Sequence, residues 1–355
     1  MVKLSLSERG LALLLMLLAG ILCVPPLARS ADSSAQEQAQ RQVTQPLNNA
    51  PMWREVRKGE NSNDTTTQVR GIETNVLVQP AGETWRRIRN GPIALYGGIL
   101  LLVVPLLILG FYSWRGPIKL HEKPTGRLIE RFNDWERIVH WATAISFVIL
   151  AVSGIIILFG KHVILPVFGY TLFSWFAIIG KNLHNFVGPL FIFCTLMMFV
   201  AYVRDNLWRA YDFKWFAKLG GMLGGNEVPS GRFNAGEKAW FWFGVTVLGI
   251  VVSTTGLVLD FPNFEQARAV MQQANVIHAS AAVLFIAISL GHIYLGTIGM
   301  KGTYDSMRHG YVDETWAKEH HLIWYEEIKA GKSRQHFVDD VPADVRSHVA
   351  QAIKA

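Results

Sequence analysis

Five long apolar runs dominate the pattern of hydrophobic and polar positions along this 355-residue chain. Each is close to the roughly 20 residues that a helix needs to cross the hydrocarbon core of a bilayer. Half of all residues are hydrophobic and 17% are charged, which favours a polytopic membrane protein over a soluble enzyme. The pattern predicts five transmembrane helices, at residues 92–113, 138–160, 183–203, 239–259 and 276–298.

Two further segments are predicted before the first span. Residues 1–30 have basic residues, a short apolar core and small residues at Ala28 and Ser30, which is typical of a secretory signal peptide. An uncleaved anchor helix is the alternative. Residues 31–91 are polar, with apolar residues too scattered to form a face, and predict a flexible periplasmic arm. A second interpretation is a strap that becomes ordered on a partner subunit around Trp53 and Trp85.

The net charge of +7 does not indicate a nucleic-acid partner, because Lys and Arg lie in the loops between apolar runs. Loops 114–137 and 204–238 carry six Lys or Arg each, whereas the two opposite loops carry two and one. Basic loops stay in the cytoplasm. We therefore expect a multi-pass membrane protein with an exported, periplasmic mature N-terminus and a cytoplasmic tail at 328–355. The interrupted apolar residues 162–180 are predicted to lie along the outer interface.

Four histidines fall within or at the ends of these spans: His140, His184, His278 and His292. A polar group in a membrane helix is costly and indicates a functional site by default, although a single histidine can also hydrogen-bond between helices. His278 and His292 are fourteen residues apart, so they share one helix face and lie roughly 21 Å apart along the axis. One metal ion cannot bind both. The spacing predicts two sites stacked across the membrane.

The predicted topology assigns the partners of each site. His184 and His278 fall near the outer face, and His140 and His292 near the inner face. Two histidine pairs at two depths suit two b-type haems with both axial positions filled, which carry electrons and do not bind oxygen. Zinc and copper seldom use two histidines alone, and Cys-ligated sites are excluded because the chain has only Cys23 and Cys194. Glycines near these histidines would make room for a porphyrin: Gly154, Gly188, Gly291 and Gly296.

Several stretches around these histidines form a recognisable set: "RFNDWERIVHW" (131–141), "NLHNFVG" (182–188), "GRFNAGEKAWFW" (231–242), "VIHASAA" (276–282), "LGHIYLG" (290–296) and "WAKEHHLIWY" (316–325). With them, residues 127–327 resemble the cytochrome b (gamma) subunit of membrane-bound respiratory formate dehydrogenase, in a long form with an N-terminal extension. The resemblance implies an all-α protein of the bacterial inner membrane. Its core would be a transmembrane four-helix di-haem cytochrome b bundle, with one additional N-terminal transmembrane helix. It also implies that the four histidines ligate two haem b groups in the pairs given above.

The same resemblance implies a quinone site beside the inner haem, formed by Asn234, Gly236, Glu237 and His292. In the family, the matching Asn-x-Gly lines a menaquinone site, and menaquinone or ubiquinone is the expected substrate here. From the residues alone, Asn234 followed three positions later by Glu237 predicts a helix cap instead. Glu237 is also a candidate proton donor. The pair His320 and His321 is predicted to be a surface or partner-contact feature.

The resemblance also implies the partners. A periplasmic catalytic alpha subunit would oxidise formate at molybdenum or tungsten, and an iron–sulfur beta subunit would pass electrons to the outer haem. They would cross to the inner haem and reduce quinone on the cytoplasmic side, in anaerobic respiration. The chain itself would carry no formate chemistry. Two alternatives remain: the same module serving a hydrogenase or thiosulfate reductase, and a proton-coupled transporter that uses the histidines as a relay.

Overall fold

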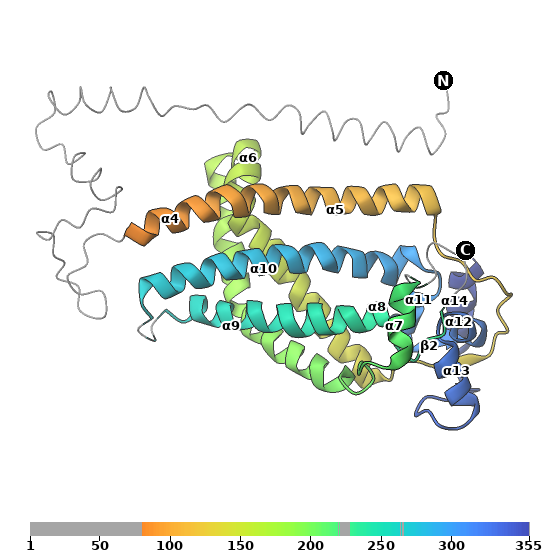
Figure 1. Cartoon of the computed structure of the whole chain (residues 1–355). Coiled ribbons are helices and arrows are strands. Elements are labelled where there is room, and N and C mark those ends of the chain that lie inside the picture. The colour runs from red at the N-terminus through yellow and green to blue at the C-terminus, as the bar shows by residue number, and fades with distance from the viewer. Residues whose placement is uncertain (1–79, 219, 221–227, 263, 265, 355) are drawn as a thin grey trace, which may run out of the picture. The chain divides into compact units, whose positions relative to one another are not determined.

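The computed structural model describes residues 80–218, 220, 228–262, 264 and 266–354 (Figure 1). The predicted signal peptide and the predicted arm up to residue 79 lie outside these residues. The chain divides into two compact units, Met1–Pro92 with Pro262–Val276, and Ile93–Phe261 with Ile277–Ala355. In the described part, the helices long and apolar enough to cross a membrane are Ala81–Arg115, Asp134–Tyr202, Ala235–Asp260 and Arg268–Gly299.

The first unit contains helix α4 (Pro80–Ile88) and the start of helix α10 (Arg268–Tyr294). The last residues of the predicted arm are therefore helical. Trp85 donates a hydrogen bond from Nε1 to Asn275 Oδ1 at 3.0 Å. This indole, which the sequence suggested as a contact for a partner subunit, is thus bonded within its own chain.

The longest helix of the second unit, α6 (Asp134–Tyr202), is a hairpin of two arms. The arms are separated by Gly169, whose φ of 74° and ψ of 177° suit a residue without a Cβ. They are antiparallel, because the Tyr202 hydroxyl donates to the Glu136 carbonyl at 2.8 Å. Farther along, a Cβ on Gly180 would lie 3.4 Å from Ile156. The predicted spans 138–160 and 183–203 are the two arms.

Residues 162–180 differ from their sequence-based prediction. They do not form a separate interfacial segment: they extend both arms of α6 as far as the turn at Gly169. The reason is local. The segment is apolar, and Gly169 is the residue within α6 whose φ and ψ are not helical, so the chain turns there. Each arm of α6 is consequently longer than a bilayer span requires.

Two more helical rods complete the bundle. One consists of α8 (Ala235–Ala239), the π-helical η3 (Trp240–Leu248) and α9 (Gly249–Asp260). The other is α10, continued by the π-helical η4 (Leu295–Gly299). A core cluster joins all four rods through Phe147 and Phe191 of the two α6 arms, Leu248 of η3 and Phe285 of α10. The predicted four-helix bundle is confirmed.

Helix α5 (Ala94–Arg115) is the additional N-terminal span. It packs on the bundle through its glycines: a Cβ on Gly97 would lie 3.3 Å from Val283 of α10, and one on Gly98 would lie 3.5 Å from Phe159 of α6. Farther along, Tyr112 meets Tyr294 edge-to-face at 6.3 Å. Large side chains on the rest of the helix, such as Leu107, are exposed and suit a lipid environment.

A compact cap, which the sequence did not predict, covers one end of the bundle. It contains a three-stranded antiparallel sheet in the order β2-β1-β3, formed by β1 (Leu128–Glu130), β2 (Tyr311–Asp313) and β3 (Phe337–Val338). Its helices are α7 (Ala210–Ala217), α11 (Thr303–Arg308), α12 (Glu314–His320), α13 (Leu322–Lys329) and α14 (Ala343–Lys354). Strands of two or three residues are too short for an alternating pattern to show in a sequence.

The predicted tail at 328–355 belongs to this cap. It supplies β3 and α14, and Val349 of α14 is buried against Leu128 of β1 in a small core cluster. A second cluster gathers Ile129, Val312, Trp316 and Trp324. The C-terminal residues therefore hold the segment before α6 against the segment after η4.

Candidate functional site

His184, on the second arm of α6, and His278, on α10, face each other. Their ring centroids lie 6.0 Å apart, with an interplanar angle of 76°. Two imidazoles that share one metal ion need roughly this separation, because each metal–nitrogen bond is about 2 Å long and each ring centre lies beyond its nitrogen. The space between the rings therefore suits a single ion.

The hydrogen bonds of these two rings define their tautomer. His184 Nδ1 lies 2.9 Å from Ser153 Oγ, and His278 Nδ1 lies 3.0 Å from Thr255 Oγ1. A hydroxyl has one hydrogen, and both hydroxyls already donate it to a carbonyl one turn back, on Ile149 and Val251. With the hydroxyl hydrogens on these carbonyls, each Nδ1 is the donor of the bond to the hydroxyl oxygen. Each Nε2 keeps its lone pair for a metal.

A glycine follows each of these hydroxyl residues and makes room for the ring. A Cβ on Gly154 would lie 3.3 Å from His184 Cε1, and one on Gly256 would lie 3.4 Å from His278 Cε1. Gly154, one of the glycines predicted to make room near the histidines, lies beside His184. Gly256, Ser153 and Thr255 were missed. The repeated Ser/Thr-Gly dipeptide was the signal, but only the fold shows that both copies face a histidine.

The inner pair is His140, on the first arm of α6, and His292, on α10. Their ring centroids lie 6.3 Å apart at 56°, and the indole of Trp240 stacks on His292 at 5.1 Å and 16°. His140 Nδ1 is buried and has no hydrogen-bond partner among the described residues. Among the described residues, His140 thus lacks the hydroxyl contact that His184 and His278 each have.

Both pairs fit a haem better than a bare metal ion. Within the described residues, no three His, Cys, Asp or Glu side chains gather to hold a metal, so two histidines need further ligands from another source. A porphyrin would supply the further ligands, and the two imidazoles of each pair would hold its iron. Gly188, Gly291 and Gly296 have no atom within 4 Å of where a Cβ would lie, as a planar group beside the helices requires.

A layer of phenylalanines separates the two histidine pairs. Phe285 lies seven residues from both His278 and His292 on α10. Its ring centroid is 4.7 Å from that of Phe147 and 6.4 Å from that of Phe191. The layer is apolar and closely packed, so it keeps the two sites distinct.

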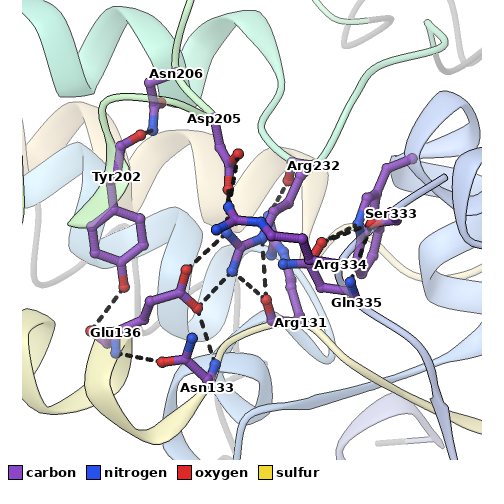
Figure 2. Close-up of polar contacts among 11 residues, drawn as sticks. Arg131, Asn133, Glu136, Tyr202, Asp205, Asn206, Arg232, Ser333, Arg334 and Gln335 are labelled. Atoms are coloured by element: carbon purple, nitrogen blue, oxygen red, sulfur yellow. Dashed lines mark hydrogen bonds and ion pairs between the residues drawn. The ribbon is translucent and has the colours of Figure 1, made fainter. Parts of the chain in front are cut away.

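A buried ion-pair network lies at the His140–His292 end of the bundle (Figure 2). Arg232 donates two hydrogen bonds to the Glu136 carboxylate, at 2.9 and 2.7 Å, and also pairs with Asp205. The Arg232 and Glu136 side chains are 5% and 7% exposed. Arg334, from the C-terminal segment, reaches the same Asp205 at 3.0 Å. The network ties both α6 arms to the loop before α8 and to the C-terminal segment.

Some of the positive charge that sets the predicted topology is therefore structural. Arg131 and Lys238 are also buried. Lys238 pairs with Asp212 of α7 at 2.8 Å, and Arg131 with Glu237 at 3.0 Å. Without Arg131, Arg232 and Lys238, the two basic loops still carry nine positive residues against three on the opposite side.

The predicted quinone residues lie at the start of the third rod. Asn234 caps α8: its Oδ1 accepts from Glu237 N at 2.9 Å, and Glu237 Oε2 accepts from Asn234 N at 2.8 Å. The helix cap expected from the residues alone is present. A Cβ on Gly236 would lie 2.9 Å from the Trp215 ring of α7. The Asn234 turn is thus covered by an indole that the sequence did not single out.

The prediction for His320 and His321 is wrong, since both side chains are buried. His321 Nδ1 donates to the Gly231 carbonyl at 2.7 Å, and its Nε2 lies 3.3 Å from Arg131 Nη2. Burial beside the Arg131 guanidinium lowers the pKa of His321 to about 3. The ring is neutral and accepts from Arg131, which in turn holds Glu237. This contact could not be predicted, because the short sheet that brings residues 131 and 321 together was not expected from the sequence.

Comparison with known proteins agrees with this architecture. The family model of prokaryotic cytochrome b561 matches residues 131–310. The formate dehydrogenase cytochrome b556(fdo) subunit of Escherichia coli K12 is 33% identical over 210 residues, 57% of this chain and 93% of the relative. Its nitrate-inducible counterpart is 31% identical over 215 residues, 59% and 95% of the two chains.

A third relative, the formate dehydrogenase cytochrome b556 subunit of Haemophilus influenzae Rd, is 26% identical over 215 residues, 58% of this chain and 85% of the relative. The matched family region begins at Arg131, directly before α6, and ends at Gly310, directly before β2. It therefore contains all four histidines and the complete four-helix bundle. The chain belongs to the prokaryotic cytochrome b561 family, and within it to the cytochrome b subunits of formate dehydrogenase.

Proposed function

We propose that this chain binds two b haems and carries electrons between them across the membrane, through His184 and His278 at the outer site and His140 and His292 at the inner site. The observation that supports this most strongly is the outer pair. Both rings are held with Nδ1–H donated to a hydroxyl and Nε2 free. When bound, each haem would take up and release one electron with no change of ligands.

The direction of transfer follows from the proposed orientation. The ion-paired cap and the basic loops lie at the His140–His292 end of the bundle, and nine exposed or part-exposed positive residues against three favour the cytoplasm for that end. The C-terminus would then be cytoplasmic and the mature N-terminus periplasmic. The outer pair would receive electrons from an iron–sulfur beta subunit, which serves a molybdenum- or tungsten-containing catalytic alpha subunit in the periplasm.

The inner pair would pass electrons to menaquinone or ubiquinone beside Asn234, Gly236, Glu237 and His292. The cap of α8 uses only Oδ1 of Asn234, so its amide group can still donate to a quinone carbonyl. The Trp215 ring packs against Gly236, 2.9 Å from where a Cβ would lie, and so covers the turn that holds this amide. Glu237 would not act as the proton donor that the sequence suggested. Both its carboxylate oxygens already accept hydrogen bonds, from Arg131 and Asn234. Its role would be to hold the turn.

The proposal is tested by counting haems in the purified full-length protein and in four alanine variants. We expect two haems per chain. His184→Ala and His278→Ala should each remove one and the same haem, and His140→Ala and His292→Ala the other. If His184→Ala and His278→Ala removed different haems, the pairing would be wrong. A reduced-minus-oxidised spectrum without b-type bands would instead favour a transporter.

The choice between formate dehydrogenase and another complex of this kind rests on the relatives, whose names identify them as formate dehydrogenase subunits. Purification of the membrane complex through a tag on this chain decides it. A co-purifying iron–sulfur subunit and formate-dependent reduction of the haems are expected. Reduction by hydrogen with no response to formate would assign the chain to a hydrogenase.

A further inference from the structure

We infer that Ser153 and Thr255 are positioning residues that set the reduction potential of the outer haem separately from that of the inner one. The inference rests on the proposed ligation by His184 and His278 and goes beyond it. Neither hydroxyl would touch the metal. Each acts through the histidine in front of it.

The two hydroxyls occupy equivalent places on different helices. Ser153 lies on the first arm of α6 opposite His184 on the second, and Thr255 lies on α9 opposite His278 on α10. In both cases the next residue is a glycine against which the imidazole packs. The outer site therefore has the same hydroxyl, glycine and ring arrangement on each side of the space for the metal.

The hydrogen bond has an electronic consequence for a ligand. When a ligating imidazole donates its second N–H to an acceptor, its metal-bound nitrogen becomes a stronger donor and its orientation is fixed. A stronger donor stabilises the ferric over the ferrous state, so the potential of that haem is lowered. Both outer ligands have this acceptor. At the inner site, His140 Nδ1 has none within the described part of the chain.

The test is a redox titration of the b haems in the purified complex carrying Ser153→Ala, Thr255→Val or both. Each substitution removes the hydroxyl oxygen beside Nδ1, keeps the backbone contacts of His184 with Leu150 and of His278 with Val252, and changes volume little. We expect the midpoint potential of one haem to rise in both single variants, the same haem in each, and to rise further in the double variant. The other haem should keep its wild-type potential.

Matched hydroxyls on the same helices provide controls. Ser146 donates to the Ala142 carbonyl at 2.8 Å, and Thr254 donates to Ile250 at 2.9 Å. Neither has a hydrogen bond to histidine among the described contacts. Ser146→Ala and Thr254→Val should leave both potentials unchanged, whereas Ser153→Thr and Thr255→Ser, which keep the oxygen, should restore the wild-type value.

The outcomes separate this inference from the proposed function. Wild-type protein without b haem contradicts the proposed function itself. Two haems with unchanged potentials in the double variant, or equal shifts of both haems, overturn the role of Ser153 and Thr255 alone. If an alanine or valine variant does not assemble, Ser153→Cys makes the same comparison, because sulfur is a weak acceptor: a raised potential supports the inference and a wild-type potential overturns it.

Discussion

At the scale of single residues, the helix-capping box occurs twice in this chain, in two different environments. Asn133 and Asn234 both begin a helix with a capping box, and in both the Oδ1 accepts from the backbone N–H of a glutamate three residues later. Their surroundings differ. The Asn133 turn joins the buried Glu136 network, whereas the Asn234 turn lies between Trp215 and the inner end of the bundle. This difference makes the quinone role of Asn234 testable.

Asn234→Asp should separate capping from quinone binding. Aspartate caps a helix as well as asparagine, but its carboxylate lacks the amide donor. We expect both haems to remain and to be reduced by the dehydrogenase, while the rate of quinone reduction falls by about 10-fold, equivalent to the roughly 1.4 kcal/mol of a lost hydrogen bond. Stopped-flow reoxidation of the reduced haems by quinone measures this rate.

The control for that variant is Asn133→Asp, which makes the same chemical change in a matching cap. It should reduce quinone at the wild-type rate. Equal rates in Asn234→Asp and wild type would leave Asn234 a structural cap only.

His321 should make the stability of the folded protein depend on pH, and the sign of this dependence follows from the pKa of the ring. That pKa is about 3 in the folded protein and about 6.5 in an unfolded chain. Between these values only the unfolded chain binds the proton, so this group's contribution to stability is present above pH 6.5 and lost as the pH falls, by up to about 1.4 kcal/mol per pH unit. His321→Gln should therefore lower the melting temperature at pH 7.5 but weaken its decrease between pH 6.5 and 5.

The comparison for His321 is His336→Gln, since His336 is an exposed residue of the same C-terminal region. That variant should keep the wild-type dependence of melting temperature on pH. A His321→Gln protein with the same slope as wild type would show that the neutral ring contributes nothing to acid sensitivity.

At the scale of elements, the glycines of α5 decide how the additional helix docks. A Cβ on Gly97 would lie 3.3 Å from Val283, whereas one on Gly110 of the same helix has no atom within 4 Å. A larger side chain at the first position must push α5 away from α10. At the second position it extends into open space.

Gly97→Leu should accordingly destabilise the protein by about 1–3 kcal/mol, the usual cost of overpacking a close contact. Gly110→Leu, the same change on the exposed side, should have little effect or a slightly favourable one, because leucine is a better helix former than glycine. Melting of the detergent-purified protein, followed by haem absorbance, compares the two. Equal melting temperatures would mean that α5 does not depend on this contact.

At the scale of the whole molecule, the proposed orientation decides which way charge moves. At the C-terminus, only a reporter that works in the cytoplasm should be active. After Ala50, only a reporter that works in the periplasm should be active. The reason is that the exposed positive residues lie mainly on the cap side. Paired cytoplasmic and periplasmic reporters at each position measure this. The opposite pattern would reverse the proposed direction of electron transfer.

The sequence by itself determined the spans. A helix needs about 20 apolar residues to cross a bilayer, and this chain has only a few apolar runs of that length. It also determined that His278 and His292 share one helix face, since helical geometry is local. The family followed from motifs spread over all four rods, and the comparisons confirm it.

Only the tertiary structure decided the features that depend on contacts distant in sequence. Ser153 meets His184 across 31 residues, and Arg131 meets His321 across 190. No local pattern specifies such pairs, because a hydroxyl or a histidine looks the same in a sequence whether it is exposed or bonded. The sheet of the cap escaped prediction for a related reason. Its strands are too short to carry a periodic signal, and they are stabilised by Trp316, Trp324 and the C-terminal helix packed against them.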